Sequence, residues 1–264
     1  MNVTTAAARM GSDGPSGGHY FFAFHGHSLA QQDALPLMNR VDKKFLINIR
    51  DLPAILQFCQ AHYSVLRIQG QTGMDYRTTY YDTPDMAFFM AHHNGVLPRK
   101  KIRTREYLNT GERYAEVKIK THKFRTIKTR ELISGDNSAA LTRRLLPAHY
   151  IRPTLEVCYT RCTLLGQQPG ERITFDFSLS CINCHSGQHF NNDNVVIIEI
   201  KQNSTDRSSP IFSALKAAGY RSINFSKYCN GCVFTQVEGI KHNRFKWQAR
   251  AFRRIAEQPQ GSQL

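Results

Sequence analysis

Lysine and arginine recur at every second position in one stretch of this chain. Arg99, Lys101, Arg103 and Arg105 follow this spacing, and Tyr107 continues it. In a β-strand, residues two apart lie on the same face of the sheet, so these side chains would project together. Clustered cations are typical of sites that bind phosphate, because a guanidinium group can contact two phosphate oxygens at once. The spacing therefore predicts a strand that contributes to an anion-binding surface.

Five other segments alternate charged and apolar residues in the same way. Their charged faces hold Arg40, Asp42 and Lys44; Glu116, Lys118 and Lys120; Lys128 and Arg130; Arg172, Thr174 and Asp176; and Glu199 and Lys201. A single strand of this kind is typical of a sheet with one solvated face. Because so many strands share the pattern and carboxylates are few, we instead expect one basic surface that surrounds an anion. The few acids would pair with arginine or hold a divalent metal on that anion.

The order of these patterns indicates the fold class, which we predict to be α+β. Most predicted strands follow one another closely, and this favours a largely antiparallel sheet. One helix is predicted after Asp51, a second from Ser209 and Pro210 to Gly219, and a third over residues 137–149. If the sheet curls into a closed barrel, with its charged side inward and the helices on its apolar outer side, it encloses a basic tunnel.

The composition agrees with an anionic partner. The 264 residues include 35 Lys and Arg against 20 Asp and Glu, which gives a formal net charge of +15. Such an excess of cations favours nucleic acid, phosphorylated metabolites, polyphosphate or an acidic membrane surface as partners. There is no apolar run of about 18 residues, as a membrane-spanning helix needs, and the start of the chain lacks a secretory h-region. We therefore expect a cytoplasmic protein, with its seven cysteines reduced.

Changes of composition suggest three parts. Residues 1–36 are rich in Gly, Ser, Ala and Gln and are predicted to be a disordered N-terminal tail. Residues 37–239 contain no linker or repeat and are predicted to form one domain. Residues 240–264 are predicted to form a basic C-terminal helix and tail.

Nine short segments, in order, resemble the catalytic domain of the VTC (vacuolar transporter chaperone) family. This family is a branch of the triphosphate tunnel metalloenzymes, which are related to the CYTH proteins. The segments are RVDKKF at 40–45, YYDTPD at 80–85, KIRTREY at 101–107, EVKIK at 116–120, KTR at 128–130, EVCYTR at 156–161, RITFD at 172–176, IEIK at 198–201 and NFSKYCNG at 224–231.

The resemblance implies a fold and an activity. The fold is a closed eight-stranded antiparallel β-barrel, the triphosphate tunnel, with helices packed on the outside. The activity is a metal-dependent polyphosphate polymerase, which transfers the γ-phosphoryl group of ATP to a growing polyphosphate chain with Mn²⁺ or Mg²⁺. Alternatives are a triphosphatase of the same fold and a sensor that binds polyphosphate or nucleotides without turning them over. A separate membrane protein is an expected partner, with the enzyme peripheral at the inner face of a membrane, and no nucleic acid is expected.

The resemblance also implies roles for individual residues. The catalytic cations are Lys44, Arg103, Arg105, Lys118, Arg161 and Lys227. Further phosphate-binding residues are Lys120, Lys128, Arg130, Tyr159, Lys201 and Ser226. Glu199 is similar to the family's metal-binding carboxylate, and Glu116, Asp176 and Asp42 are further candidates for the metal site.

The segment from Arg40 to Lys44 departs from the hydrolytic relatives. Those proteins have an N-terminal Glu-x-Glu-x-Lys motif whose two acids help to bind metal, whereas here Arg40 replaces the first acid and Asp42 the second. Fewer acids imply fewer bound metals and a weaker means of activating water. The departure favours the VTC branch, although Asp42 keeps the triphosphatase alternative open.

Four cysteines form two Cys-x-x-Cys pairs. They are Cys181 with Cys184 and Cys229 with Cys232. Four thiolates can hold a structural zinc ion, and this site would form if the two segments meet. The spacing between the pairs is longer than in common zinc ribbons, so reduced thiols without a metal are the favoured interpretation.

The basic C-terminal segment allows two interpretations. Phe245, Trp247, Phe252 and Ile255 lie between basic residues, a pattern that suits an anionic membrane surface or nucleic acid. The favoured alternative is a terminal helix that closes one end of the barrel, because four large apolar side chains need burial.

Overall fold

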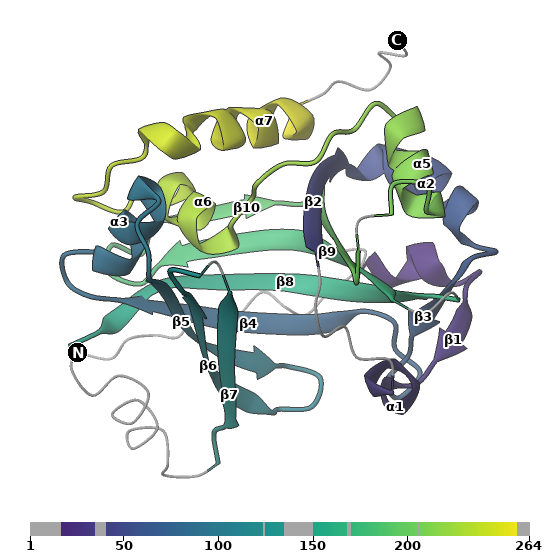
Figure 1. Ribbon diagram of the computed structural model, residues 1–264, viewed down its shortest axis with the longest axis horizontal. Coiled ribbons are helices and arrows are strands. Elements are labelled where there is room, and N and C mark those ends of the chain that lie inside the picture. Colours follow the sequence, from purple (N-terminus) through teal and green to yellow (C-terminus); the bar gives the residue numbers. More distant parts are fainter. Residues whose placement is uncertain are drawn as a thin grey trace.

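The computed structural model describes residues 17–34, 41–123, 125–134, 150–167, 170–204 and 206–257. These residues form a sheet of 11 strands, whose centre is the long antiparallel pair of β8 and β9 (Figure 1). The main path of paired strands runs in the order β2 (Val41–Asn48), β11 (Val195–Gln202), β9 (Glu171–Asn183), β8 (Arg152–Gly166), β4 (Met74–Asp82), β5 (Arg99–Tyr107), β6 (Arg113–Lys120) and β7 (Thr126–Leu132).

Three short strands lie at the margins of this path. They are β1 (His25–His27), β3 (Tyr63–Leu66) and β10 (His189–Asn192). β3 pairs with β8, β10 pairs with β9, and β1 pairs with β3. The β1–β3 pair is parallel, whereas the other pairs among the described strands are antiparallel. The prediction of a largely antiparallel sheet is confirmed.

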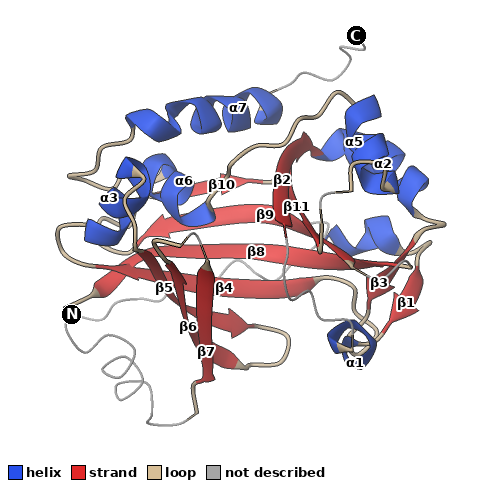
Figure 2. Cartoon of the chain, in the orientation of Figure 1, coloured by secondary structure: helices blue, strands red, loops and turns tan. Residues whose placement is uncertain are grey.

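Two helices cover the apolar face of the sheet, and both lie where the sequence predicts them. α2 (Leu52–Cys59) and α5 (Pro210–Ala217) pack against each other, apart from α3, α6 and α7 (Figure 2). The short 3₁₀ turn η2 (Ile49–Asp51) leads into α2. α2 buries the four residues at helical spacing, which are Leu52, Ile55, Leu56 and Cys59. Asp51 stands at the N-cap of α2 without a side-chain hydrogen bond to the helix.

Residues 17–34 also pack on this face, although the sequence predicts a tail up to residue 36. They form η1 (Gly17–Phe21), β1 and α1 (Leu29–Asp33). Phe21 is fully buried, and its ring meets that of Phe175 edge-on at 5.2 Å between centroids. Phe24 joins the same core. A buried aromatic ring contributes a large apolar area, which outweighs the cost of ordering this glycine-rich segment.

The charged face of the sheet carries helices as well, whereas the prediction placed helices on the apolar outer side and one at an end of the barrel. α6 (Lys227–Phe234) and α7 (Lys246–Ala256) pack there, and α3 (Ala87–Asn94) lies beside α6 (Figure 2). The strands expose a second apolar patch on this face that these helices bury, with Leu46, Leu155, Val157, Leu179 and Ile197. The short turn η4 (Asn243–Phe245) precedes α7.

The sheet is open, so the predicted closed eight-stranded barrel is wrong. β2 and β7 are the two ends of the path, and within the described residues each pairs with one neighbour of the path, β11 and β6 respectively. The N-terminus of α6 contacts β5 on one side and β9 on the other. A helix is about 10 Å wide, twice the spacing of paired strands, so a helix between the two flanks keeps them from pairing. The α+β class is unaffected by this correction.

The two remaining helix predictions have different outcomes. The basic C-terminal helix is present as α7, which packs on α6, β2 and β11 instead of closing a barrel. The helix predicted at 137–149 lies outside the described residues.

Candidate functional site

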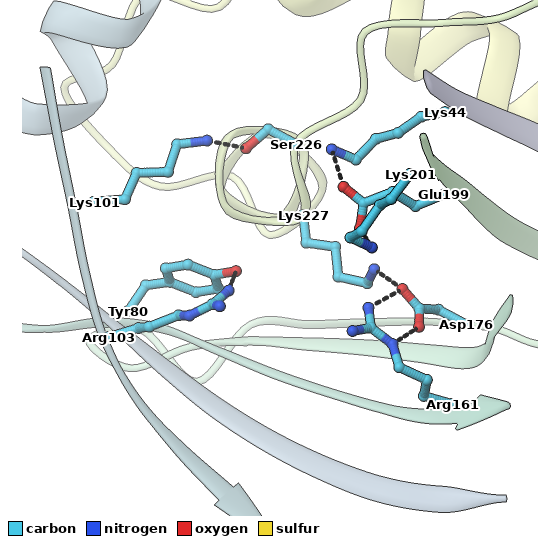
Figure 3. A network of polar contacts seen from close by, with 10 residues as sticks. All are labelled: Lys44, Tyr80, Lys101, Arg103, Arg161, Asp176, Glu199, Lys201, Ser226 and Lys227. Carbon is cyan, nitrogen blue, oxygen red and sulfur yellow. Dashed lines mark hydrogen bonds and ion pairs between the residues drawn. The ribbon is translucent and has the colours of Figure 1, made fainter. Parts of the chain in front are cut away.

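The charged side chains of the sheet form two groups with the N-terminus of α6 between them (Figure 3). One group lies on β5, β6 and β7, and the other on β2, β11, β9 and β8. We call this surface the cationic face, and its members are Lys44, Lys101, Arg103, Arg105, Glu116, Lys118, Lys128, Arg130, Arg161, Asp176, Glu199, Lys201 and Lys227.

The register of β5, β6 and β7 places three lysines directly opposite one another. Lys101 is opposite Lys118, and Lys118 is opposite Lys128. Residues in such positions have Cβ atoms about 5 Å apart, so their like charges repel and destabilise the sheet. The row itself contains no carboxylate, although Lys128 reaches Glu116 in the next row. An anion above the row would relieve the remaining repulsion.

Glu116 stands in the next row and joins three cations. It is 3% exposed, and it lies opposite Arg103 on β5 and Arg130 on β7. Its carboxylate lies 2.5 Å from Arg103 Nη2 and 2.8 Å from Lys128 Nζ. Burial alone raises the pKa of Glu116, but the charges of Arg103, Arg105 and Lys128 outweigh it and lower the pKa to about 2. Glu116 is therefore ionised and orients the cations around it.

Asp176 has the same role in the second group. It is 1% exposed and accepts two hydrogen bonds from Arg161, at 2.5 Å from Nε and 2.8 Å from Nη2. Lys227 Nζ also donates to this carboxylate, at the Oδ2 that accepts from Arg161 Nη2. Although burial raises the pKa of Asp176, Arg161 and Lys227 lower it well below the usual range. This carboxylate orients an arginine, which was one of the two roles that the sequence left open.

Two stacked tyrosine rings support the cations of this group. Tyr76 and Tyr159 are parallel, with 5.2 Å between their centroids. Arg161 lies over both rings, Arg105 over Tyr76, and Lys227 over Tyr159 at 4.6 Å from its centroid. Tyr159 therefore presents its aromatic face to cations, whereas the resemblance implies that it binds phosphate. Burial raises the pKa of the Tyr159 hydroxyl, but Arg105 and Arg161 bring it below its ordinary value.

Glu199 lies between two lysines on the β2 side. One carboxylate oxygen is 3.2 Å from Lys44 Nζ, and the other is 2.7 Å from Lys201 Nζ. Asp42 is opposite Lys201 at the start of β2. Both oxygens of the carboxylate predicted to bind metal are thus engaged by ammonium groups.

The acids of the cationic face do not fit a resident divalent cation. Glu116, Asp176 and Glu199 are each satisfied by cations in separate groups. Over the ranges that the structure describes, no three His, Cys, Asp or Glu side chains are arranged to hold a metal ion. Ca²⁺ and Mg²⁺ prefer several oxygen ligands, and one carboxylate already paired with two lysines is a poor substitute.

The two Cys-x-x-Cys pairs do not assemble a zinc site. Cys181, Cys229 and Cys232 are buried, whereas Cys184 is exposed. Among the residues that the structure describes, which include all four cysteines, no group of three is arranged to hold a metal ion, so the alternative of a structural zinc site has no support here. Burial raises the pKa of the Cys181 thiol to about 12, so this sulfur stays protonated and is a weak ligand.

Ser226 and Lys101 form a contact that the sequence did not predict. Ser226 caps α6, accepting a hydrogen bond from Cys229 N, and its hydroxyl also receives one of 2.9 Å from Lys101 Nζ (Figure 3). Burial, aided by the nearby charges of Lys44 and Lys118, lowers the pKa of Lys101 to about 8. The strand pattern places Lys101 on the charged face, but only the fold brings it to α6.

Asp82 is a second residue that the sequence did not single out. It is fully buried and accepts hydrogen bonds of 2.8 Å from the backbone N–H groups of Thr83, Phe88 and Phe89. It also accepts one from the hydroxyl of Tyr228, the residue after Lys227. Asp82 thus joins β4, α3 and α6. In the sequence, Asp82 lies in the YYDTPD segment, which resembles the VTC family. The resemblance could have drawn attention to Asp82, but it did not indicate this structural role.

Two further predicted residues are Arg105 on β5 and Lys120 on β6. Arg105 is 8% exposed, and within the described residues it makes no ion pair; its Nε donates to Thr78 Oγ1 at 3.4 Å. Lys120 ends β6 opposite Arg99. Arg40 lies outside the described residues.

Comparison with known proteins identifies a family. The VTC domain family matches residues 39–148 and 135–235. No curated protein sequence matches the chain. No described helix is long and apolar enough to cross a membrane.

Several solved structures show a distant likeness. A candidate adenylyl cyclase from Hippeastrum, described as having a dominant triphosphatase activity, is 13% identical with a TM-score of 0.47, covering 74% of this chain and 96% of that one. A candidate adenylate cyclase from Vibrio parahaemolyticus is 15% identical with a TM-score of 0.44, covering 72% and 96%. A protein from Pyrococcus horikoshii OT3 is 17% identical with a TM-score of 0.45, covering 75% and 98%.

Proposed function

Because the chain belongs to the VTC domain family, we propose that it transfers the γ-phosphoryl group of ATP to an inorganic polyphosphate chain on the cationic face. The observation that carries this proposal is the row of Lys101, Lys118 and Lys128 beside the buried Arg105. Such an excess of cations in a partly buried setting calls for a polyanion. A chain of phosphates supplies repeated charges along the row.

The arrangement suits a reaction in which charge neutralisation and alignment provide most of the catalysis. A terminal phosphate oxygen of the acceptor forms a bond to the γ-phosphorus, and the bond from that phosphorus to the β–γ bridging oxygen breaks, so ADP leaves. The acceptor oxygen is already ionised near neutral pH and needs no general base. Arg103 and Arg161 are held by carboxylates in fixed orientations, and such positioned guanidinium groups stabilise charge on the transferring oxygens.

Synthesis fits the side chains of this face better than hydrolysis does. Hydrolysis requires a water molecule to be activated by a general base or a metal ion. The carboxylates that could serve as bases, Glu116, Asp176 and Glu199, are paired with cations. Triphosphatase activity stays the second possibility, because Asp42, opposite Lys201, occupies the position of the second acid in the motif of the hydrolytic relatives.

The test is incubation of the purified chain with ATP, in parallel with inorganic triphosphate, each with and without Mn²⁺. ADP, orthophosphate and polyphosphate are resolved in the same reaction. ADP together with long chains supports the proposal. Orthophosphate without chains replaces it with a triphosphatase, and neither product, together with tight binding of polyphosphate, replaces it with a sensor.

A pair of arginine variants ties the activity to this surface. Arg105→Ala is expected to reduce ATP-dependent synthesis at least about 100-fold, the usual cost of losing a charged contact to the transition state. Arg113→Ala is the control, because Arg113 is exposed at the start of β6 and lies opposite Glu106, on the other face of the sheet. Equal activity of both variants would place the reaction elsewhere.

A further inference from the structure

The outward side of α7 carries four cations and the only tryptophan of the chain. Trp247 is 55% exposed. The four cations, all exposed, are Lys246, Arg250, Arg253 and Arg254. With spacings of three and four residues, these side chains share one face of the helix with Trp247.

The opposite side of α7 is fixed on the protein. Phe252 is fully buried, and its ring lies 5.7 Å from that of Phe225 and 5.1 Å from that of Phe234. Asn48 Nδ2 donates a hydrogen bond of 2.7 Å to the carbonyl of Ile255, near the end of the helix. The helix therefore has its apolar core contacts already, and the exposed tryptophan is not part of them.

The charges on this side are not balanced. The segment 239–256 contains no aspartate or glutamate. In the part of the chain that the structure describes, none of the four cations makes an ion pair with a carboxylate. On the cationic face, by contrast, several cations are paired with Glu116, Asp176 or Glu199.

We propose that this side of α7 docks the protein on a membrane surface that contains anionic phospholipid. Tryptophan favours the headgroup region of a bilayer, where its ring is partly buried and its N–H stays hydrated. Lysine and arginine beside it are attracted by the negative surface potential of anionic lipids. Because the apolar side of α7 is packed on the protein, this docking depends on the cations and on Trp247, and not on insertion of the apolar face of an amphipathic helix.

The shape of the molecule favours a membrane over nucleic acid. α7 lies along the outside of the protein, packed over its length on the layer below (Figure 1). A helix that reads duplex DNA must enter a groove about 12 Å wide, and this helix does not project far enough to do so. A flat surface can contact all five exposed side chains at once.

This docking would set the position of the cationic face relative to the membrane, because α7 packs on α6, and α6 carries Lys227. The proposal does not depend on the reaction. A protein without polymerase activity would bind the same vesicles.

The experiment uses the single tryptophan as a local reporter. The full chain is titrated with vesicles of phosphatidylcholine alone or with 30 mole per cent phosphatidylglycerol, at about 0.05 M and about 0.5 M salt, since exposed charges are screened at the higher concentration. We expect a blue shift of Trp247 emission and co-sedimentation with the anionic vesicles at low salt. Brominated lipid should quench the emission, because the ring lies at the interface.

Charge-reversal variants test whether vesicle binding depends on this side of α7 or only on the net positive charge of the protein. Arg250→Glu combined with Arg254→Glu should weaken binding at least about 20-fold, since each cation near an anionic surface contributes severalfold to the affinity. The matched control is Arg207→Glu with Lys216→Glu, which changes the net charge equally at exposed positions far from α7 in the sequence. Far-UV circular dichroism confirms that both variants are folded.

Four results would overturn the proposal. The first two are a lack of binding to anionic vesicles at low salt and binding without a change in Trp247 emission. The third is an equal loss of vesicle affinity in the two double variants. The fourth is a shift of the emission by a single-stranded oligonucleotide at lower concentration than the vesicles require. The last result would assign the surface to nucleic acid.

Discussion

Ser226 and Lys227 are consecutive residues that contact opposite flanks of the sheet. Ser226 accepts a hydrogen bond from Lys101 on β5, and Lys227 donates one to Asp176 on β9 (Figure 3). The start of α6 therefore joins the two cation groups that an anion on this surface would contact. Changes at this junction should affect binding and stability in separable ways.

Lys101 should make anion binding depend on pH. Because its pKa is lowered to about 8, Lys101 is charged below that pH and neutral above it. The affinity for tripolyphosphate, measured by calorimetry, should fall about tenfold between pH 7 and pH 9 as one charged hydrogen bond is lost. Lys101→Arg keeps its charge over this range, so its affinity should change much less.

The control for this measurement is Lys100→Arg, on the opposite face of the same strand. It should follow the pH profile of the unmodified protein. Superposition of the Lys101→Arg profile on that of the unmodified protein would show that another group is responsible.

Glu116 should stabilise the folded protein above pH 4.5. Its pKa is lowered from 4.5 to about 2, so its contribution is complete above pH 4.5 and disappears as the pH falls towards 2. Glu116→Gln should lower the free energy of unfolding by about 2 kcal/mol at pH 7, since the partly exposed Lys128 and Arg130 reduce the full effect. Urea unfolding at pH 7 and pH 3 measures the loss, which should be smaller at pH 3.

Glu112→Gln is the comparison, because Glu112 is an exposed acid just before the same strand. It should change the stability by less than about 0.5 kcal/mol at either pH. A loss in Glu116→Gln that is the same at both pH values would contradict the electrostatic explanation.

Asp82 should hold α6 through Tyr228. Asp82→Asn replaces one acceptor oxygen with an NH₂ group that faces backbone donors, so it should lower the free energy of unfolding by about 3 kcal/mol. Tyr228→Phe should cost about 1 kcal/mol, the value of one hydrogen bond. Because the two groups interact directly, the double variant should cost less than the sum.

Asp85→Asn tests whether any acid of this segment would behave alike, since Asp85 is exposed three residues away. Its stability should be unchanged within about 0.5 kcal/mol. Strict additivity of Asp82→Asn and Tyr228→Phe would be evidence against the coupling of α3 and α6 through this bond.

Glu199 should not bind a divalent metal in the absence of nucleotide. Both of its oxygens are engaged by Lys44 and Lys201, which also repel a cation. Titration of the purified chain with Mn²⁺, followed by electron paramagnetic resonance, should show no site tighter than about 1 mM, the range of weak oxygen sites. A micromolar site that Glu199→Gln abolishes would restore the metal role implied by the family resemblance.

The composition of the cationic face was decided by the sequence. Alternation in a strand is a local property of the backbone, so the shared faces of Lys101 with Arg103 and of Glu116 with Lys118 follow from spacing alone. The structure confirms these faces through the register of β5 and β6. The helices α2 and α5 were predictable for the same reason, because their apolar residues follow the helical period.

The partners across the sheet were decided by the tertiary structure. α6 contains Asn230 and Gly231, which are poor helix formers, so its helical form depends on burial and on the Ser226 cap. The contact of Ser226 with Lys101 spans 125 residues, and no local pattern encodes such a distance. Likewise, two Cys-x-x-Cys spacings suggest a zinc site, but the fold leaves Cys184 exposed.

The tertiary structure also determined whether the sheet closes into a barrel. The alternation of β2 and β7 is compatible with a barrel or with an open sheet, because strand patterns specify faces and not edges. The apolar residues Leu46 and Ile197 share the charged face and require a helix to cover them. Burial of that patch places α6 and α7 on the charged face, which the sequence pattern alone predicts to be a phosphate-binding surface. Because α6 occupies space between the two flanks of the sheet, β2 and β7 stay apart.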